Sequence, residues 1–153
     1  MLKSTVMSKL RWISGALLLL ATATSHAVDF KTVGAAPVIL YDAPSAKGGK
    51  LYVAPRGMPL EVVLSYGEWV KVRDASGEMA WTEAKGLSAK RNLVARAANL
   101  KVRASPDDTS SAVLLLDKGV LLEMSEQPSS GWIKVRHKDG QTGYVKTSEV
   151  WGL

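Results

Sequence analysis

Two segments of the chain alternate apolar and polar residues with a period of two. In the first, Trp69–Arg73, Val70 and Val72 occupy every second position. The second, Trp132–Arg136, repeats this pattern 63 residues further along the chain. Alternation with this period is typical of β-strands that bury one face. We therefore predict two equivalent strands whose aliphatic residues face a core and whose tryptophans and basic residues face outward.

Both strands belong to a longer internal repeat. Matched residues keep a spacing of 62 before a loop at residues 127–130 and of 63 after it, because the second copy has one extra residue there. The matched pairs are Pro44/Pro106, Gly57/Gly119, Glu61/Glu123, Trp69/Trp132, Val72/Val135, Gly77/Gly140 and Trp81/Tyr144. A repeat of this kind indicates two copies of one fold unit. Frequent turn signals between short strands predict an all-β chain of two small barrels or sandwiches.

We place the first copy at residues 28–90 and the second at residues 91–153, with the boundary near Lys90-Arg91. Phe30–Val33 and Leu93-Val94 are expected to open the two units. Each copy has about 60 residues and no cysteine, which is near the lower size limit for a domain without disulfides. We therefore expect the two copies to pack against each other.

The first 27 residues resemble a secretory signal rather than part of the fold. A basic start is followed by an apolar stretch at residues 13–24 and by Ser25-His26-Ala27, so cleavage is predicted after Ala27. The apolar stretch is shorter than the roughly 20 residues that cross a bilayer. We expect a periplasmic protein without a stable membrane span after cleavage; the alternative is an uncleaved anchor. No cysteine follows, which excludes lipoprotein processing.

Charge excludes one class of partner. The whole chain has a formal net charge of +6, but Lys3, Lys9 and Arg11 belong to the predicted signal. The remaining chain carries only about +3, which is mild. A nucleic-acid-binding protein would need a denser basic patch, so no nucleic acid is expected as a partner.

The ordered motifs of the second copy resemble a bacterial SH3 domain. They are Leu100–Pro106, Lys118–Glu123, Gly131–Arg136 and Asp139–Val145. The first copy is similar but less regular, through Leu40–Ser45, Pro55–Gly57, Gly67–Arg73 and Gly77–Trp81. The resemblance covers essentially the whole chain after Ala27. It implies two tandem SH3-like β-barrels, a fold that carries many unrelated ligand sites.

The sequence argues against catalysis. Covalent catalysis needs a nucleophile with an oriented base, whereas the chain has no cysteine and His137 is its single histidine after Ala27. Glu61 and Glu123 would lie in separate barrels, away from a shared substrate bond. Cysteine peptidases of the cell wall often carry bacterial SH3 modules, and this chain resembles the modules without the enzyme. We expect no enzyme, no catalytic or metal-binding residue and no cofactor.

Binding is the better interpretation, and the first copy holds the better candidates. If Val70 and Val72 face the core, Trp69 points outward together with Lys71 and Arg73. In SH3 domains that bind peptides, the resemblance places Trp69 and Trp81 along the ligand groove. It also gives Tyr41 the place of the tyrosine in the Ala-Leu-Tyr-Asp-type motif. Aromatic rings stack on sugars or peptides, and the basic neighbours suit carboxylates.

The second copy offers a poorer groove. Trp132 and Tyr144 take the corresponding places, but Val102-Arg103 stands where the first copy has Leu40-Tyr41. We therefore expect a weaker or more structural role for this copy.

The predicted function is non-catalytic recognition of peptidoglycan or of an envelope protein or peptide. Two alternatives stay open. One is a structural adaptor whose aromatic residues pack between the barrels or between chains. The other is an envelope hydrolase that uses a pair of carboxylates. The sequence does not predict an oligomeric state.

Overall fold

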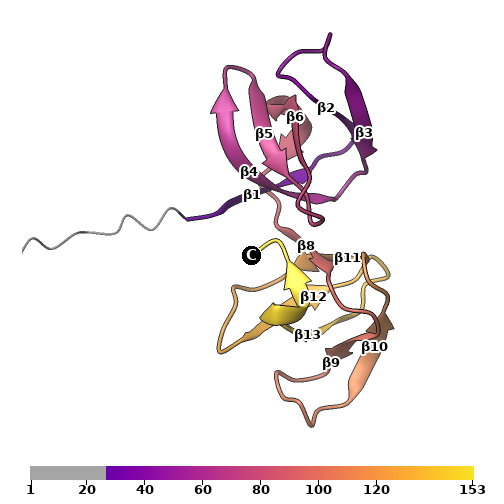
Figure 1. Cartoon of the computed structure of the whole chain (residues 1–153). Helices are drawn as coiled ribbons and strands as arrows, with labels where there is room; N and C mark the ends of the chain where they lie inside the picture. Colours follow the sequence, from indigo (N-terminus) through magenta and orange to yellow (C-terminus); the bar gives the residue numbers. More distant parts are fainter. Residues whose placement is uncertain (1–26) are drawn as a thin grey trace, which may run out of the picture.

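The computed structural model describes residues 27–153 and consists of two successive β-units (Figure 1). The predicted signal, apart from Ala27, lies outside the described residues. Within the described part, no helix has the length and apolar content needed to cross a membrane.

The first unit is a seven-stranded antiparallel sheet that curls into a small barrel. Its strands are β1 (Asp29–Val33), β2 (Val38–Tyr41), β3 (Lys50–Ala54), β4 (Pro59–Tyr66), β5 (Trp69–Arg73), β6 (Met79–Glu83) and β7 (Leu87–Ser88). A single 3-10 turn, η1 (Ala84–Gly86), precedes β7. The order across the sheet is β3-β2-β6-β5-β4-β1-β7.

The second unit repeats this arrangement strand for strand. Its elements are β8 (Asn92–Ala95), β9 (Leu100–Arg103), β10 (Ala112–Leu116), β11 (Leu121–Met124), β12 (Trp132–Arg136), β13 (Thr142–Lys146), η2 (Thr147–Glu149) and β14 (Val150–Trp151). The sheet order is β10-β9-β13-β12-β11-β8-β14, which matches the first sheet position by position. The predicted all-β fold of two tandem barrels is therefore confirmed.

Each barrel encloses its own aliphatic core, and the predicted strand phase explains why. In β5 and β12 the residues at the second and fourth positions are buried, whereas the tryptophan and lysine positions are only partly buried. Val72 and Val135 are both 1% exposed. Turns set the register: Gly77 and Gly140 both have positive φ values, of 95° and 90°, at the hairpins that follow these strands.

A compact junction joins the two barrels. The ring of Phe30 in β1 meets the ring of Trp151 in β14 edge to face, with centroids 4.9 Å apart. Arg91 lies over the Phe30 ring and donates a 2.7 Å hydrogen bond to the carbonyl oxygen of Gly152. The C-terminus consequently ends at the junction (Figure 1). The expected packing between copies is present, and Trp151 takes part in it.

Candidate functional site

The predicted aromatic residues of the first barrel meet on three adjacent strands. Tyr41 of β2 stands opposite Trp81 of β6, and Trp81 stands opposite Lys71 of β5. Side chains that are directly opposite in an antiparallel sheet share a face, so these three form one row. Trp69 lies two residues from Lys71 on the same face of β5. We call Tyr41, Trp69, Lys71 and Trp81 the aromatic face.

Ring geometry within the aromatic face is well defined. The rings of Tyr41 and Trp69 pack edge to face, with centroids 5.5 Å apart and planes at 81°. Lys71 Nζ lies 6.0 Å from the centroid of the Trp81 ring, a cation–π distance. All four residues are partly buried. The face therefore offers supported rings with accessible surface, the arrangement that stacking on sugars or peptides requires.

Arg73 is engaged with a neighbour on the adjacent strand. Its Nη1 donates hydrogen bonds of 2.9 and 3.2 Å to the two carboxylate oxygens of Glu61 in β4. Its Nη2 also lies 3.9 Å from the sulfur of Met79. Arg73 faces outward as predicted, but its charge is compensated by Glu61. Lys71, by contrast, has no ion-pair partner among the described residues.

The second barrel places Trp132 and Tyr144 at the same positions but surrounds them with cations. Lys146 of β13 stands opposite Trp132, with its Nζ 5.8 Å from the indole centroid. Lys134 Nζ lies 6.0 Å from the Tyr144 centroid. Arg103 stands opposite Tyr144, where the first barrel has Tyr41 opposite Trp81. We call these five residues the basic face.

Ion pairs and a hydrogen bond hold the cations of the basic face in place. Lys146 binds Asp108 at 2.6 Å, and Lys134 binds Glu126 at 3.1 Å. The hydrogen bond with Glu126 raises the pKa of Lys134. Arg103 Nη1 donates a 2.7 Å hydrogen bond to the carbonyl oxygen of Ser110. Lys134 corresponds to Lys71 of the first barrel, whereas Lys146 and Arg103 stand where the first barrel has Glu83 and Tyr41.

A polar cluster in the first barrel was not predicted from the sequence. Asp74, which is 7% exposed, accepts hydrogen bonds from the Tyr52 hydroxyl, from the Ser76 hydroxyl at 2.6 Å and from the Ser76 and Glu78 amides at 2.9 and 3.0 Å. Burial raises the pKa of Asp74, but these hydrogen bonds outweigh it, so its pKa lies below the ordinary value. Burial and the carboxylate raise the pKa of Tyr52.

The cluster is structural rather than part of the aromatic face. Tyr52 stands opposite Leu40, which is fully buried, so its ring points toward the core side of the sheet. The sequence shows Asp74 only as a turn residue before Gly77. Its burial depends on Tyr52, 22 residues earlier in the chain, and local patterns carry no such information.

His137 takes the place of Asp74 in the second barrel. Its Nδ1 lies 3.2 Å from a carboxylate oxygen of Asp139 in the same hairpin. Within residues 27–153, no three histidine, cysteine, aspartate or glutamate side chains are grouped so that they could hold a metal ion.

Comparison with solved structures finds proteins in which the similar region is one part of a longer chain. NlpC1 from Trichomonas vaginalis is 12% identical with a TM-score of 0.39; the match covers 88% of this chain and 49% of that one. NlpC2 from the same organism is 9% identical with a TM-score of 0.38, covering 82% and 48%. An NlpC/P60 family protein from Bacillus cereus is 13% identical with a TM-score of 0.36, covering 80% and 56%. The chain spans about half the length of these proteins, and no curated protein matches it.

A family model decides the classification. The model described as bacterial SH3 domain matches residues 34–88 and 96–152, one segment in each barrel. These segments cover more than half of the chain, and they contain the motifs that carried the resemblance. The chain therefore belongs to the bacterial SH3 domain family and carries two copies of the domain in tandem.

Proposed function

We propose that this protein is exported and acts as a non-catalytic binding protein of the cell envelope that recognises peptidoglycan through the aromatic face. The observation that carries the proposal is the row of Tyr41, Trp81 and Lys71 beside Trp69. Rings stack on the apolar faces of sugars, and a lysine at their edge attracts stem-peptide carboxylates. Membership of the bacterial SH3 family supports a cell-wall ligand.

Other features support a non-catalytic role. The two glutamates at equivalent places, Glu61 and Glu123, lie in separate barrels and each is bound by an arginine. Hydrogen bonds from Arg136 and Lys90 hold the pKa of Glu123 below its ordinary value, which makes this carboxylate poorly suited to act as a general acid. Incubating labelled peptidoglycan with the protein tests this point directly. Release of soluble fragments would favour the hydrolase alternative.

Co-sedimentation with purified sacculi tests the site. We compare the protein of residues 28–153 with its Trp69→Ala and Trp132→Ala variants. Trp132→Ala removes the equivalent ring of the basic face. Because aromatic residues at the centre of an interface often contribute 2 kcal/mol or more, we expect Trp69→Ala to weaken binding at least about tenfold. Trp132→Ala should have a much smaller effect. Equal retention of folded Trp69→Ala and unchanged protein would rule out the aromatic face as the site.

The adaptor alternative is separated by the state of association. The barrel junction uses Phe30 and Trp151, so an adaptor role for the aromatic face would have to act between chains. Light scattering after gel filtration measures this: a dimer that Trp69→Ala converts to monomer would favour the adaptor. Export is tested separately, by cell fractionation and by the mass of the recovered protein, which should begin at Val28.

A further inference from the structure

A concave surface lies between the barrels, and no residue of the aromatic face lines it. Its volume is about 990 Å³, and both domains contribute to its walls. The first barrel supplies the turn that contains Arg56 and Gly57, and the second supplies Val120–Glu123 and the hairpin around Lys138. We call this surface the inter-barrel groove. Its volume lies at the upper end of the range for small-molecule sites, so a short peptide segment would fit.

The groove concentrates positive charge. Four of its lining residues are cations, Arg56, Lys90, Arg136 and Lys138, and only Glu123 is acidic. This leaves an excess of three positive charges at one place. The chain after the predicted signal has a total excess of only three, with 17 basic and 14 acidic residues. The remaining surface is therefore balanced overall, and the groove carries the net charge.

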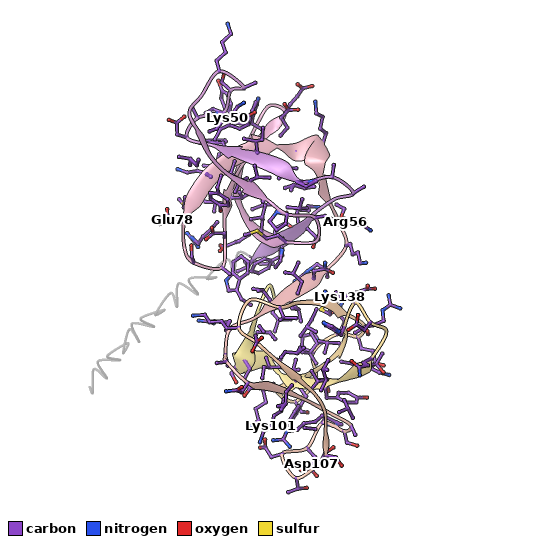
Figure 2. All side chains as sticks on the ribbon, turned by 90° about the vertical axis from the view of Figure 1, so that its right-hand side faces the viewer. Lys50, Arg56, Glu78, Lys101, Asp107 and Lys138 are labelled. Carbon is purple, nitrogen blue, oxygen red and sulfur yellow. The ribbon has the colours of Figure 1, made fainter. Side chains whose placement is uncertain are left out.

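The charges divide into a compensated group and a free pair. Glu123 is bound by Arg136 at 2.6 Å and by Lys90 at 2.9 Å, so three of the charged groups form one network. Arg56 and Lys138 are both exposed and form no ion pair within the described part of the chain. They come from different barrels and lie on the same side of the junction (Figure 2). A ligand that contacts both must bridge the two domains.

The remaining lining favours a peptide over a glycan. No phenylalanine, tyrosine or tryptophan from the described residues lines the groove, so the stacking surface that sugars use is missing. The half-buried Val120 and Leu121 supply aliphatic contact area instead. An extended acidic peptide offers what these walls complement: carboxylates for the guanidinium and ammonium groups, and small apolar side chains for the aliphatic surface.

Direct contacts hold the groove in shape before any ligand binds. Asn92 donates a 2.8 Å hydrogen bond from Nδ2 to the carbonyl oxygen of Gly57 and a 3.3 Å hydrogen bond from its amide to the Thr32 hydroxyl. Gly57 has a φ of 83°, and a Cβ there would meet Asn92 and Leu121. The two walls are thus joined across the junction, which lowers the ordering cost of binding.

From these observations we propose that the inter-barrel groove binds an extended acidic segment of a partner protein, with its carboxylates on Arg56 and Lys138 and its small apolar side chains on the aliphatic wall. The site exists only where both barrels are present, which gives the tandem arrangement a function that one domain alone lacks. This site is independent of peptidoglycan binding by the aromatic face.

Fluorescence anisotropy with a labelled peptide of alternating glutamate and alanine tests the proposal on residues 28–153, which contain both complete barrels. We compare Arg56→Ala, Lys138→Ala and the double variant with Lys50→Ala and Lys101→Ala, whose lysines lie well away from the junction (Figure 2). Two exposed charge contacts predict about tenfold weaker binding for the double variant. The Lys50 and Lys101 variants should bind as the unchanged protein does.

His137 provides an independent location of the ligand. It lines the groove and is the single histidine after residue 26, so its ring signals in a nuclear magnetic resonance spectrum need no further assignment. The acidic peptide should shift these signals in the unchanged protein and not in the double variant. The double variant should still sediment with sacculi, which separates this site from the aromatic face.

Three results would overturn the proposal. Undetectable binding of the peptide removes the site. Equal weakening by the Lys50 and Lys101 variants would mean that the peptide responds only to overall charge. Displacement of the peptide by soluble peptidoglycan fragments, together with their own shift of the His137 signals, would assign the groove to peptidoglycan instead of a protein partner.

Discussion

The two barrels have the same sheet order and equivalent buried positions, yet their outer faces differ in chemistry. Val70 and Val72 correspond to Ile133 and Val135, and all four are buried. On the outside, Tyr41 is replaced by Arg103. Burial therefore restricts the inward positions of both copies to aliphatic residues, whereas the outward positions are free to diverge. The tryptophan of β5 and β12 and the aromatic residue of the next strand occur in both barrels. Their presence is therefore typical of the domain and does not by itself indicate a binding site.

A second outward difference stands beside the tryptophan itself. Trp69 faces Glu83 across the strands, whereas Trp132 faces Lys146. Glu83 pairs with Lys85, whereas Lys146 Nζ lies 5.8 Å from the centroid of the Trp132 indole. The charge beside the tryptophan is thus reversed between the copies: a carboxylate stands opposite Trp69, and an ammonium group lies over the Trp132 ring.

The hairpin after β5 also differs between the copies, and it predicts the largest effect. Asp74 accepts four hydrogen bonds in the first barrel, whereas His137 has one close carboxylate neighbour in the second. Because Asp74→Ala leaves several partly buried donors unsatisfied, we expect a loss of about 1–3 kcal/mol in the free energy of unfolding. Urea denaturation followed by tryptophan fluorescence measures it. His137→Ala is the matched control, and an equal loss for both variants would contradict the assignment.

Grafting the aromatic face onto the second barrel sharpens the comparison of the outer faces. We expect Arg103→Tyr combined with Lys146→Glu, introduced into Trp69→Ala, to restore sacculus binding by up to about tenfold over Trp69→Ala alone. The added tyrosine recreates the row of side chains across three adjacent strands. Lys146→Glu removes the ammonium group that lies over the Trp132 ring. Co-sedimentation gives the measurement.

The control for the graft carries Arg103→Ala with Lys146→Glu, which changes the charge without adding a ring. If this control restores binding as well as the graft does, then charge and not the tyrosine distinguishes the two faces.

The stabilising contribution of Asp74, which the second barrel lacks, should depend on pH. Its folded-state pKa lies below the ordinary value, so its contribution to stability is complete above the unfolded pKa of about 4 and is lost as pH falls through the folded pKa. We expect the stability gap between the unchanged protein and Asp74→Asn to stay constant from pH 7 to about 5 and to narrow below about 4. Denaturation at several pH values measures the gap. A gap that widens toward acid would reverse the assigned sign.

Much of the architecture could be predicted from the sequence, because period-two alternation and glycine turns are local signals. The repeat of Trp69–Arg73 in Trp132–Arg136 identified equivalent strands, and the structure places them at equivalent positions of two sheets. The cover over Trp132 could not be predicted, since Lys146 and Asp108 come from separate strands and loops. The inter-barrel groove could not be predicted for the same reason: Arg56 and Lys138 line one groove only because the two domains pack together.

The smallest expected effect concerns a feature that the barrels share. Strand β3 and strand β10 each end their sheet, and each exposes two aliphatic side chains: Val53 is 60% exposed and Leu115 is 61% exposed, with Leu51 and Val113 at the neighbouring outward positions. Because these side chains gain little burial on folding, we expect Val53→Lys and Leu115→Lys each to change the free energy of unfolding by no more than about 0.5 kcal/mol.

Both lysine variants should also reduce self-association at high concentration, since a charge on an edge strand opposes pairing with another chain. Light scattering at increasing concentration measures self-association. Urea denaturation measures the change in stability, and Leu116→Ala shows that this assay detects a loss, because Leu116 is buried and its truncation should cost about 2–5 kcal/mol. The effects at β3 and β10 should be equal. A loss of stability or of solubility in only one barrel would show that its edge strand is covered in the folded protein. The two barrels would then be alike in their cores but not in their edge strands.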